Sequence, residues 1–140
     1  MLRGINKLLT GDILKILCDM GHGDELVIAD ANFPAETCAK RLIRVPGISG
    51  TEMLKAIMEV FPIDTYVESP CVIMDLTMSD KEKGMVIPEI WNEYKNITNS
   101  DLFKIERNEF YERTKNAYVV IQTGEEKQYG NIIVVKGVVL

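Results

Sequence analysis

The sequence predicts an α/β protein of three layers, in which a mixed, largely parallel sheet lies between helices. Short apolar runs typical of buried strands alternate along the chain with segments whose apolar residues recur at helical spacing. The chain has 140 residues, of which 46% are hydrophobic, and is therefore long enough to bury one full core. We expect a single domain over residues 1–140.

Turn and capping residues give the boundaries of the first elements. Thr10 precedes an apolar stripe at helical spacing and is suited to cap that helix, which Gly21 then ends. Ser49 and Glu52 form a capping box at the start of a second helix. The predicted elements are a helix over 10–20, a strand over 25–29, a loop over 30–34, a strand over 41–45, a helix over 49–61 and a strand over 71–74.

The second half of the chain predicts two more helices and three more strands. Residues 80–84 are highly charged and are expected to form a surface loop, and Asn108 is expected to cap a helix that runs to residue 116. The other predicted elements are a helix opened by Pro88, strands over 103–107, 117–122 and 132–139, and a turn over 123–129. The short link between the last two strands predicts an antiparallel pair. The last strand, with a break at Gly137, is so apolar that we expect it in the middle of the sheet or covered by another subunit.

Charge and cysteine content exclude several classes of function. A net charge of −5 argues against binding to nucleic acid or to anionic membranes. No apolar run approaches the ~18 residues of a membrane span, and the N-terminus lacks the apolar segment of a signal peptide, so we expect a cytoplasmic protein. Cys18, Cys38 and Cys71 are scattered and are expected to be buried or partly buried thiols. With one histidine and no phosphate-binding glycine loop, we predict neither a metal nor a cofactor.

His22 and Asp30 are the strongest candidates for chemistry. His22, the only histidine, lies between Gly21 and Gly23, and an imidazole is a general acid or base near neutral pH; the alternative is a loop histidine that bonds its neighbours. Asp30 follows the next predicted strand, where open α/β sheets bind ligands; its alternative is a turn residue. Because a strand separates the two, they share a site only if the Gly-His-Gly loop folds back or if two subunits each supply one.

Further polar residues are candidates for binding. Arg107 stands at the end of a predicted strand, with a solvated arginine as the alternative. Tyr129, Gly130 and Asn131 form either a plain turn or a binding segment, in which a phenol, an unhindered backbone and an amide suit a polyol. Two aromatic residues at helical spacing are expected in the core or at an interface, Trp91 and Tyr111. Without a nucleophile elbow, this set of residues favours proton transfer on a small neutral ligand.

Four segments, in matching order over nearly the whole chain, resemble the L-fucose mutarotase and D-ribose pyranase family. They are Met-Gly-His-Gly-Asp-Glu at 20–25, Asp-Ala-Asn-Phe-Pro at 30–34, Phe-Tyr-Glu-Arg at 110–113 and Tyr-Gly-Asn-Ile-Ile at 129–133, with Lys-Gly-Val at 136–138 behind the last. The resemblance implies that His22 is the proton donor and that Asp30, Arg107 and the segment from Tyr129 to Asn131 contact a sugar. It also implies a homo-oligomer, a decamer of two pentameric rings, with each site near a subunit boundary.

Three positions favour the fucose branch of that family. Arg107 stands where the pyranase branch typically carries a second histidine, Gly130 where that branch has alanine, and Gly23 where it commonly has threonine. The resemblance therefore implies interconversion of the α and β anomers of L-fucose by acid/base-catalysed ring opening. The alternatives are pyranose–furanose exchange of D-ribose, a sugar-sensing ring without catalysis, and a purely structural oligomer.

Overall fold

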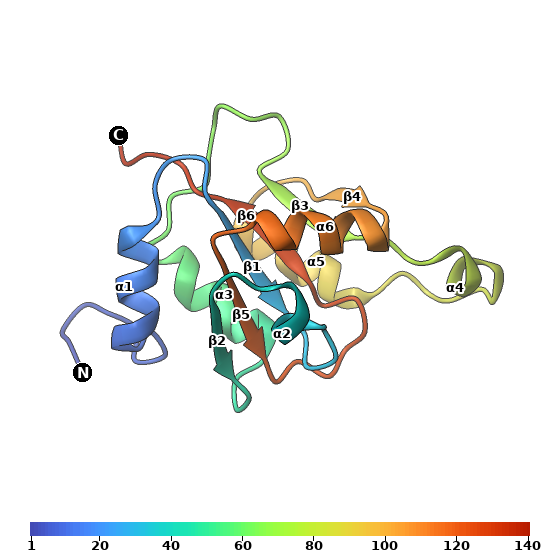
Figure 1. Cartoon of the computed structure of the whole chain (residues 1–140), viewed down its shortest axis with the longest axis horizontal. Coiled ribbons are helices and arrows are strands. Elements are labelled where there is room, and N and C mark those ends of the chain that lie inside the picture. Colours follow the sequence, from blue (N-terminus) through green and yellow to red (C-terminus); the bar gives the residue numbers. More distant parts are fainter.

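The computed structural model describes all residues, 1–140, as a six-stranded sheet with helices on both faces (Figure 1). The strands are β1 (Glu25–Ala29), β2 (Leu42–Val45), β3 (Cys71–Met74), β4 (Phe103–Ile105), β5 (Val119–Thr123) and β6 (Ile132–Val135), in the spatial order β2-β5-β1-β6-β3-β4. The helices are α1 (Gly11–Asp19), α2 (Ala35–Cys38), α3 (Gly50–Met58), α4 (Met78–Glu82), α5 (Glu89–Thr98) and α6 (Arg107–Asn116). The predicted α/β fold class is confirmed.

Successive residues of the central strands point into two separate cores, one on each face of the sheet. In β1, Leu26 and Ile28 pack with α1, α3 and α5, whereas Val27 and Ala29 pack with α2 and α6. Because both faces are covered, the central strands are continuously apolar rather than alternating. None of the six helices has the length and the apolar character that crossing a membrane requires.

The position of β6 corrects one prediction and confirms another. β5 and β6 are not partners, because β6 lies between β1 and β3 and runs antiparallel to both, while the other three strand pairs are parallel. The last strand is thus central, as predicted, and it makes the sheet mixed. It ends at Val135, earlier than predicted, and Gly137 crosses the segment before β3 so closely that a Cβ there would lie 2.7 Å from the Asp64 Cα.

Arg107 lies at the start of α6 and not in the strand in which it was predicted. The Glu106 carboxylate caps the helix by accepting hydrogen bonds from the amides of Asn108 and Glu109, at 2.8 and 3.2 Å. Asn108 is therefore inside the helix and is not its cap. Arg107 becomes the first residue of α6, and β4 ends two residues before it.

Three other helices show which elements local sequence signals predict and which they do not. The capping box of α3 is confirmed, since the Ser49 hydroxyl accepts from the Glu52 amide and the Glu52 carboxylate accepts from the Ser49 amide. Residues 80–84, predicted as a loop, instead overlap α4, because the Thr77 hydroxyl accepts the Asp80 amide at 3.2 Å and caps that short helix. The four-residue helix α2 was not predicted.

The loop that carries His22 reverses its direction at Gly23. Thr10 caps α1 as predicted, but Gly21 does not end that helix in a left-handed conformation, and Met20 after the helix is already extended. Gly23 has the positive φ, +87°, which a glycine adopts without the steric cost that other residues bear. The backbone therefore turns directly after His22.

Gly124→Ala is expected to destabilise the fold. Gly124 follows β5 and passes so close to another loop that an added Cβ would lie 2.0 Å from the Pro46 carbonyl oxygen. Backbone does not yield as a flexible side chain does, so we expect a loss of about 1–3 kcal/mol in the free energy of unfolding, measured by urea denaturation. Gly11→Ala is the matched control, since nothing lies within 4 Å of its Cβ position. Equal losses in the two variants would contradict this reading of the packing.

Candidate functional site

A cavity of about 570 Å³ opens at the edge of the sheet where the parallel strands end. Asp30 follows β1, Met74 ends β3, and Arg107 lies just beyond β4. β6 runs in the opposite direction, so Tyr129 and Asn131, which precede it, reach the same edge. The structure thus brings together four of the predicted binding residues. The rest of the lining comprises Asn32, Phe33, Thr77, Ser79, Asp80, Tyr111 and Gln128.

Asp30 and Asn131 form a reciprocal hydrogen-bonded pair in the wall of this cavity. The Asn131 Oδ1 accepts the Asp30 backbone amide at 2.8 Å, and the Asn131 Nδ2 donates to the Asp30 Oδ2 at 3.0 Å. The other carboxylate oxygen of Asp30 accepts the Asn32 amide at 3.0 Å. Both paired side chains are almost fully buried, yet they line the cavity. The carboxylate is therefore held rigidly, with acceptor sites left for the hydroxyls of a ligand.

The buried position of Asp30 disfavours the ionised form of its carboxyl group. Burial raises the pKa of the Asp30 carboxyl above its usual range, while hydrogen bonds from Asn32, Asn131 and Gly130 act in the other direction without cancelling the effect. A carboxyl whose pKa is higher in the folded than in the unfolded chain binds more protons in the folded chain. Its contribution to stability therefore falls as the pH rises through that window, which begins near the ordinary value of 3.8 and extends upward.

We expect Asp30→Asn to remove this pH dependence. The free energy of unfolding of the natural chain, measured relative to the variant by urea denaturation at a series of pH values, should decrease as the pH rises above about 4. Asn keeps the size of the side chain but has no titrating proton. Two stability curves that run parallel through the window would show that burial does not disfavour the charge of Asp30.

Tyr129 connects the cavity to α4. Its phenol donates a hydrogen bond to the Asp80 carboxylate and accepts the Thr77 amide at 3.2 Å, while its carbonyl accepts from the Trp91 indole at 3.0 Å. Its φ of +61° is rare for a residue with a side chain. Because the phenolic hydrogen is engaged by Asp80, the oxygen can offer a ligand only an acceptor site.

Gly130 does not line the cavity. A Cβ at this residue would lie 3.0 Å from the Glu125 Cγ and 3.2 Å from the Ile90 Cδ1, and its carbonyl accepts the Tyr94 hydroxyl at 3.0 Å. Close packing against the core side of the loop thus accounts for the glycine. The predicted contact between Gly130 and a ligand stays a prediction.

Aromatic side chains form a second, less polar wall. Phe33 packs edge-on against Tyr111, with ring centroids 5.5 Å apart, and Met74 lines the same cavity. Tyr111, which we expected in the core or at an interface, is half-buried and belongs to this wall, one helical turn after Arg107. Trp91 is in the core as expected. The cavity therefore offers both hydrogen-bonding and apolar surfaces.

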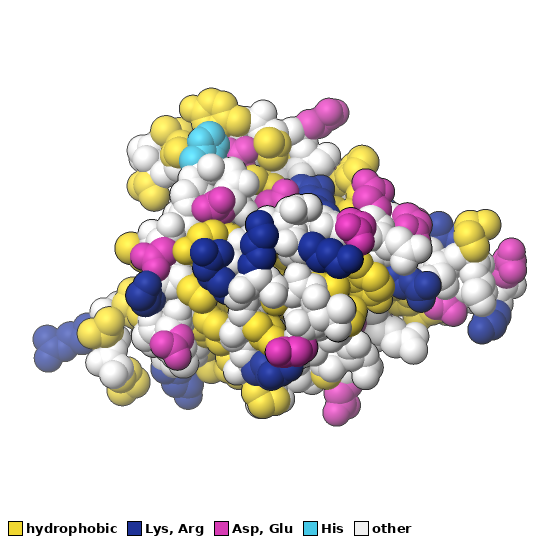
Figure 2. Space-filling model, in the orientation of Figure 1, with side chains coloured by type: hydrophobic (Ala, Val, Ile, Leu, Met, Phe, Trp, Pro, Cys, Tyr) yellow, Lys and Arg dark blue, Asp and Glu magenta, His cyan; other side chains and the backbone are white.

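His22 lies elsewhere, at the opposite end of β1. Its Nε2 is 2.8 Å from the Oδ1 of Asp64, and its ring packs 5.2 Å from the ring of Tyr66. Figure 2 shows the single histidine, in cyan, at the surface beside hydrophobic side chains. The His22 side chain is 45% exposed, whereas that of Asp64 is 1% exposed. A buried carboxylate thus holds an accessible imidazole.

The hydrogen bond with Asp64 determines which nitrogen of His22 is free. Burial would raise the pKa of Asp64, but hydrogen bonds from His22 and from the amides of Val67 and Tyr66 outweigh burial and hold that pKa below its usual range. The carboxylate is therefore ionised and can only accept, so the Nε2 of His22 carries the hydrogen. The Nδ1 is left for a ligand, and the carboxylate lies where it stabilises positive charge when the ring takes up a proton.

Within one chain, His22 does not reach the cavity. The five residues of β1 alone span about 16 Å between the two. The Gly-His-Gly loop does not fold back along the strand, because the Gly23 amide donates to the Lys136 carbonyl at 2.8 Å beyond the end of β6. The sequence left open whether the Gly-His-Gly loop folds back or two subunits each supply one of the two residues. In the structure of the single chain, the loop does not fold back.

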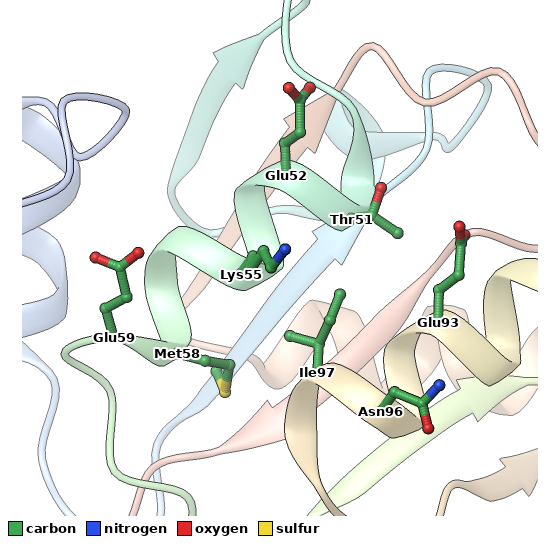
Figure 3. Close-up of a pocket in the computed structure, with 8 residues that line it drawn as sticks. All are labelled: Thr51, Glu52, Lys55, Met58, Glu59, Glu93, Asn96 and Ile97. Carbon is green, nitrogen blue, oxygen red and sulfur yellow. The ribbon is translucent and has the colours of Figure 1, made fainter.

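A second hollow, of about 750 Å³, lies between α3 and α5 and contains none of the predicted residues (Figure 3). Its carboxylates, from Glu52, Glu59 and Glu93, spread apart instead of converging, and Glu52 is already engaged in capping α3. No three His, Cys, Asp or Glu side chains converge on one point anywhere in the chain. Two of the cysteines are buried as expected, whereas Cys18 is exposed.

Several residues of the cavity and of the His22 environment were not predicted from the sequence. Asp80 and its neighbours looked like a solvated charged run, although Thr77 and Asp80 have the spacing of a helix cap, which was the one available signal. Asp64 gave no signal, because it is 42 residues from His22 in sequence and stands in a loop. Only the three-dimensional crossing of that loop by the segment after β6 brings it into place.

Comparison with known proteins gives one consistent family. Residues 3–139 match the family described as RbsD / FucU transport protein family. The fucose mutarotase of Mus musculus is 48% identical over 144 residues, which cover 97% of this chain and 94% of the mouse protein.

Solved structures agree with that match. The crystal structure of the fucose mutarotase in complex with L-fucose from Streptococcus pneumoniae superposes with a TM-score of 0.92 at 41% identity, covering 99% of this chain and all of that one. The structure of Bacillus subtilis RbsD complexed with D-ribose is less similar, with a TM-score of 0.75 at 26% identity and full coverage of both chains.

Proposed function

This chain belongs to the RbsD / FucU transport protein family, and we propose that it catalyses the mutarotation of L-fucose, the interconversion of the α and β anomers. The observation that carries the proposal is the cavity in which the Asp30–Asn131 pair, Arg107 and Tyr129 meet. These groups suit a small neutral polyol. A relative 41% identical over 99% of this chain is described with L-fucose bound.

The two walls of the cavity favour L-fucose over D-ribose. L-Fucose carries hydroxyls together with a methyl group at C6, and ribose has no such methyl. The polar wall is suited to bind the hydroxyls, while Phe33, Met74 and Tyr111 offer an apolar surface for the methyl group. A volume of about 570 Å³ is ample for one monosaccharide. The higher identity to fucose mutarotases than to the ribose-bound relative supports the same choice.

The reaction needs two proton transfers and no change in oxidation state. A proton reaches the ring oxygen and another leaves the anomeric hydroxyl, so that the bond between C1 and the ring oxygen breaks and an aldehyde forms. The aldehyde rotates about the C1–C2 bond, and the reverse transfers close the ring with either configuration. Positioned acid and base groups accelerate a reaction by about 10²–10⁴-fold. An acceleration of this size is sufficient, because the rings of free sugars already open slowly in water.

In the proposed mechanism, His22 is the group that protonates the ring oxygen. Its free Nδ1 is accessible. The ionised carboxylate of Asp64, which is bound to the Nε2, stabilises the positive charge of the protonated ring. Asp30, Asn131 and Arg107 bind hydroxyls and fix the orientation of the sugar. Because one chain keeps His22 and Asp30 at opposite ends of β1, we propose that each site combines His22 of one subunit with Asp30 of its neighbour.

Such a site requires an oligomer. A contact between two different surfaces of neighbouring copies repeats until the ring closes, which suits the expected decamer of two pentameric rings. We propose that residues 1–140 act as one folded unit in this assembly and that the protein works in the cytoplasm without a cofactor.

Exchange NMR on L-fucose tests the proposed function directly. Saturating the anomeric proton of one anomer should reduce the signal of the other when the protein is present and not when it is absent. D-Ribose at equal concentration is the comparison, and faster pyranose–furanose exchange of ribose would favour the pyranase alternative. Tight binding of L-fucose without any exchange would favour a sugar sensor. No binding of either sugar, with unchanged thermal stability at millimolar sugar, would point to a structural oligomer.

A further inference from the structure

Glu125 is a buried acidic residue that the proposed mechanism does not use. It lies in the loop between β5 and β6, and only 6% of its surface is exposed. Lys127, two residues along the chain, forms its ion pair with Glu93 at 3.6 Å and not with Glu125. Acidic residues are rarely buried so deeply without a cationic partner, because burial of an unpaired charge is costly. The surroundings of Glu125 must therefore compensate this cost in another way.

Backbone amides take the place of a cationic partner. The Oε2 of Glu125 accepts the Gly50 amide at 3.1 Å, and the Oε1 accepts the Lys127 amide, also at 3.1 Å. Gly50 is the first residue of α3, so the carboxyl group lies at the positive end of that helix dipole. Two carboxylate oxygens fit two N–H donors, whereas the side-chain amide of a glutamine would place its NH2 group against one of them. This position is therefore specific for a carboxylate.

Glu125 also contacts both halves of the polar wall of the cavity from behind. Its backbone carbonyl accepts the amide of Ala31, the residue directly after Asp30, at 2.9 Å. Its side chain packs under Gly130, where an added Cβ would lie 3.0 Å from the Glu125 Cγ. Gly130 lies between the two other proposed sugar contacts of its segment. Glu125 thus supports the backbone on both sides of the wall without lining the cavity itself.

Tyr94 completes a packed cluster behind the segment 129–131. Its hydroxyl donates to the Gly130 carbonyl at 3.0 Å, and its ring lies against Gly50. Burial, and after it the charge of Glu125, raises the pKa of the Tyr94 phenol, which therefore keeps the hydrogen that it donates. The start of α3, the carboxylate and the binding segment are consequently held as one unit.

We propose that Glu125 is a positioning residue for sugar binding, which holds the segment 129–131 in its place relative to Asp30. The inference rests on the proposed function, in which these residues bind the hydroxyls of L-fucose. The direct pair of Asp30 and Asn131 joins the two halves of the wall at the surface of the cavity, and Glu125 joins them behind it. Without the second connection, the two halves move relative to each other and the hydroxyl contacts weaken. Proton transfer by His22 does not pass through Glu125.

Glu125→Gln tests the proposal through a separation of binding from turnover. The variant keeps the size of the side chain but loses one acceptor, and we expect the dissociation constant of L-fucose, measured by calorimetry, to rise by about tenfold or more. The KM of anomeric exchange should rise with it, while kcat stays close to that of the natural chain. An unchanged dissociation constant, with only a lower thermal stability, would mean that Glu125 serves the fold alone and would overturn the proposal.

Glu52→Gln is the matched control at the same end of α3. The Glu52 carboxylate accepts the Ser49 amide at 3.1 Å and is exposed, and it has no hydrogen bond to the segment 129–131. The control should therefore lower the stability of the fold and leave the binding of L-fucose unchanged. Equal losses of binding in the two variants would show that the start of the helix, and not the contacts of Glu125, affects the site, which also overturns the proposal.

The fluorescence of the single tryptophan reports on the binding segment in the absence of sugar. The indole N–H of Trp91 donates to the Tyr129 carbonyl at 3.0 Å, and the two rings pack edge-on. The emission maximum should shift in Glu125→Gln and not in Glu52→Gln, and an unshifted maximum in Glu125→Gln would contradict the proposed positioning. This readout needs neither binding nor turnover. A natural chain that neither binds nor exchanges L-fucose would therefore contradict the proposed function, while the emission would still decide whether Glu125 positions the segment.

Discussion

His22→Gln should lower the anomeric exchange of L-fucose by about 10²–10⁴-fold, the range that a positioned general acid supplies. Glutamine cannot carry the proton to the ring oxygen. Its amide can still donate to Asp64, so the buried carboxylate is not left without a partner. The side chain is 45% exposed, and we therefore expect the fold, the assembly and the binding of L-fucose to persist.

Two measurements separate this effect from a loss of structure. Thermal unfolding with and without L-fucose should show the same stabilisation by the sugar in the variant as in the natural chain. Added imidazole should restore part of the exchange in His22→Ala, where the space of the ring is vacant. A donor role also predicts that exchange by the natural chain declines toward alkaline pH. Near-normal exchange in His22→Gln, or a rate that stays flat from about pH 5 to 9, would mean that His22 is structural.

Asp64→Asn is expected to have the next largest effect and to lower the rate of anomeric exchange by about 10- to 100-fold. This loss is part of the acceleration of about 10²–10⁴-fold that a general acid contributes. The variant keeps the shape of the side chain but loses the charge that supports a protonated ring. Its amide can also donate to the Nε2, which would place the imidazole hydrogen on the Nδ1 in the neutral ring. The dependence of exchange on pH should therefore change in shape as well as in height.

Asp24→Asn is the matched control. Asp24 accepts the Gly21 amide at 2.7 Å in the same loop but does not contact the imidazole. Asp24→Asn should leave the shape of the pH profile unchanged. If Asp64→Asn lowers exchange equally at every pH, Asp64 only supports the loop and does not act through His22.

The sequence predicted best those elements that local chemistry determines. The runs that became β1, β3 and β6 are apolar because both of their faces are buried, and the box of Ser49 and Glu52 caps α3 through neighbouring atoms. The order of the strands depends on a crossover, so a short link after β5 gave no warning that β6 would insert between β1 and β3.

The residues of the candidate site also differ in how well the sequence predicts them. Asp30 and Asn131 were predictable because each stands where a strand begins or ends, and the strand pairing of β1 with β6 brings such positions together. Asp64 was not predictable from the sequence, since its place depends on a close crossing of two backbone segments that only a glycine at Gly137 permits. Residues 80–84 were predicted as a surface loop from their charges alone, whereas they overlap α4 and Asp80 accepts a hydrogen bond from Tyr129.

Mixed oligomers of His22→Gln and Asp30→Asn subunits test the central claim, that each site combines residues of two subunits. Each variant alone should be almost inactive. In an equal, randomly assembled mixture, an intact His22 meets an intact Asp30 at about a quarter of the head-to-tail contacts, so about a quarter of the natural exchange should return. Native mass spectrometry would establish that mixed assemblies form. If they form and the mixture stays as inactive as its parents, each site is complete within one subunit, and the account is wrong.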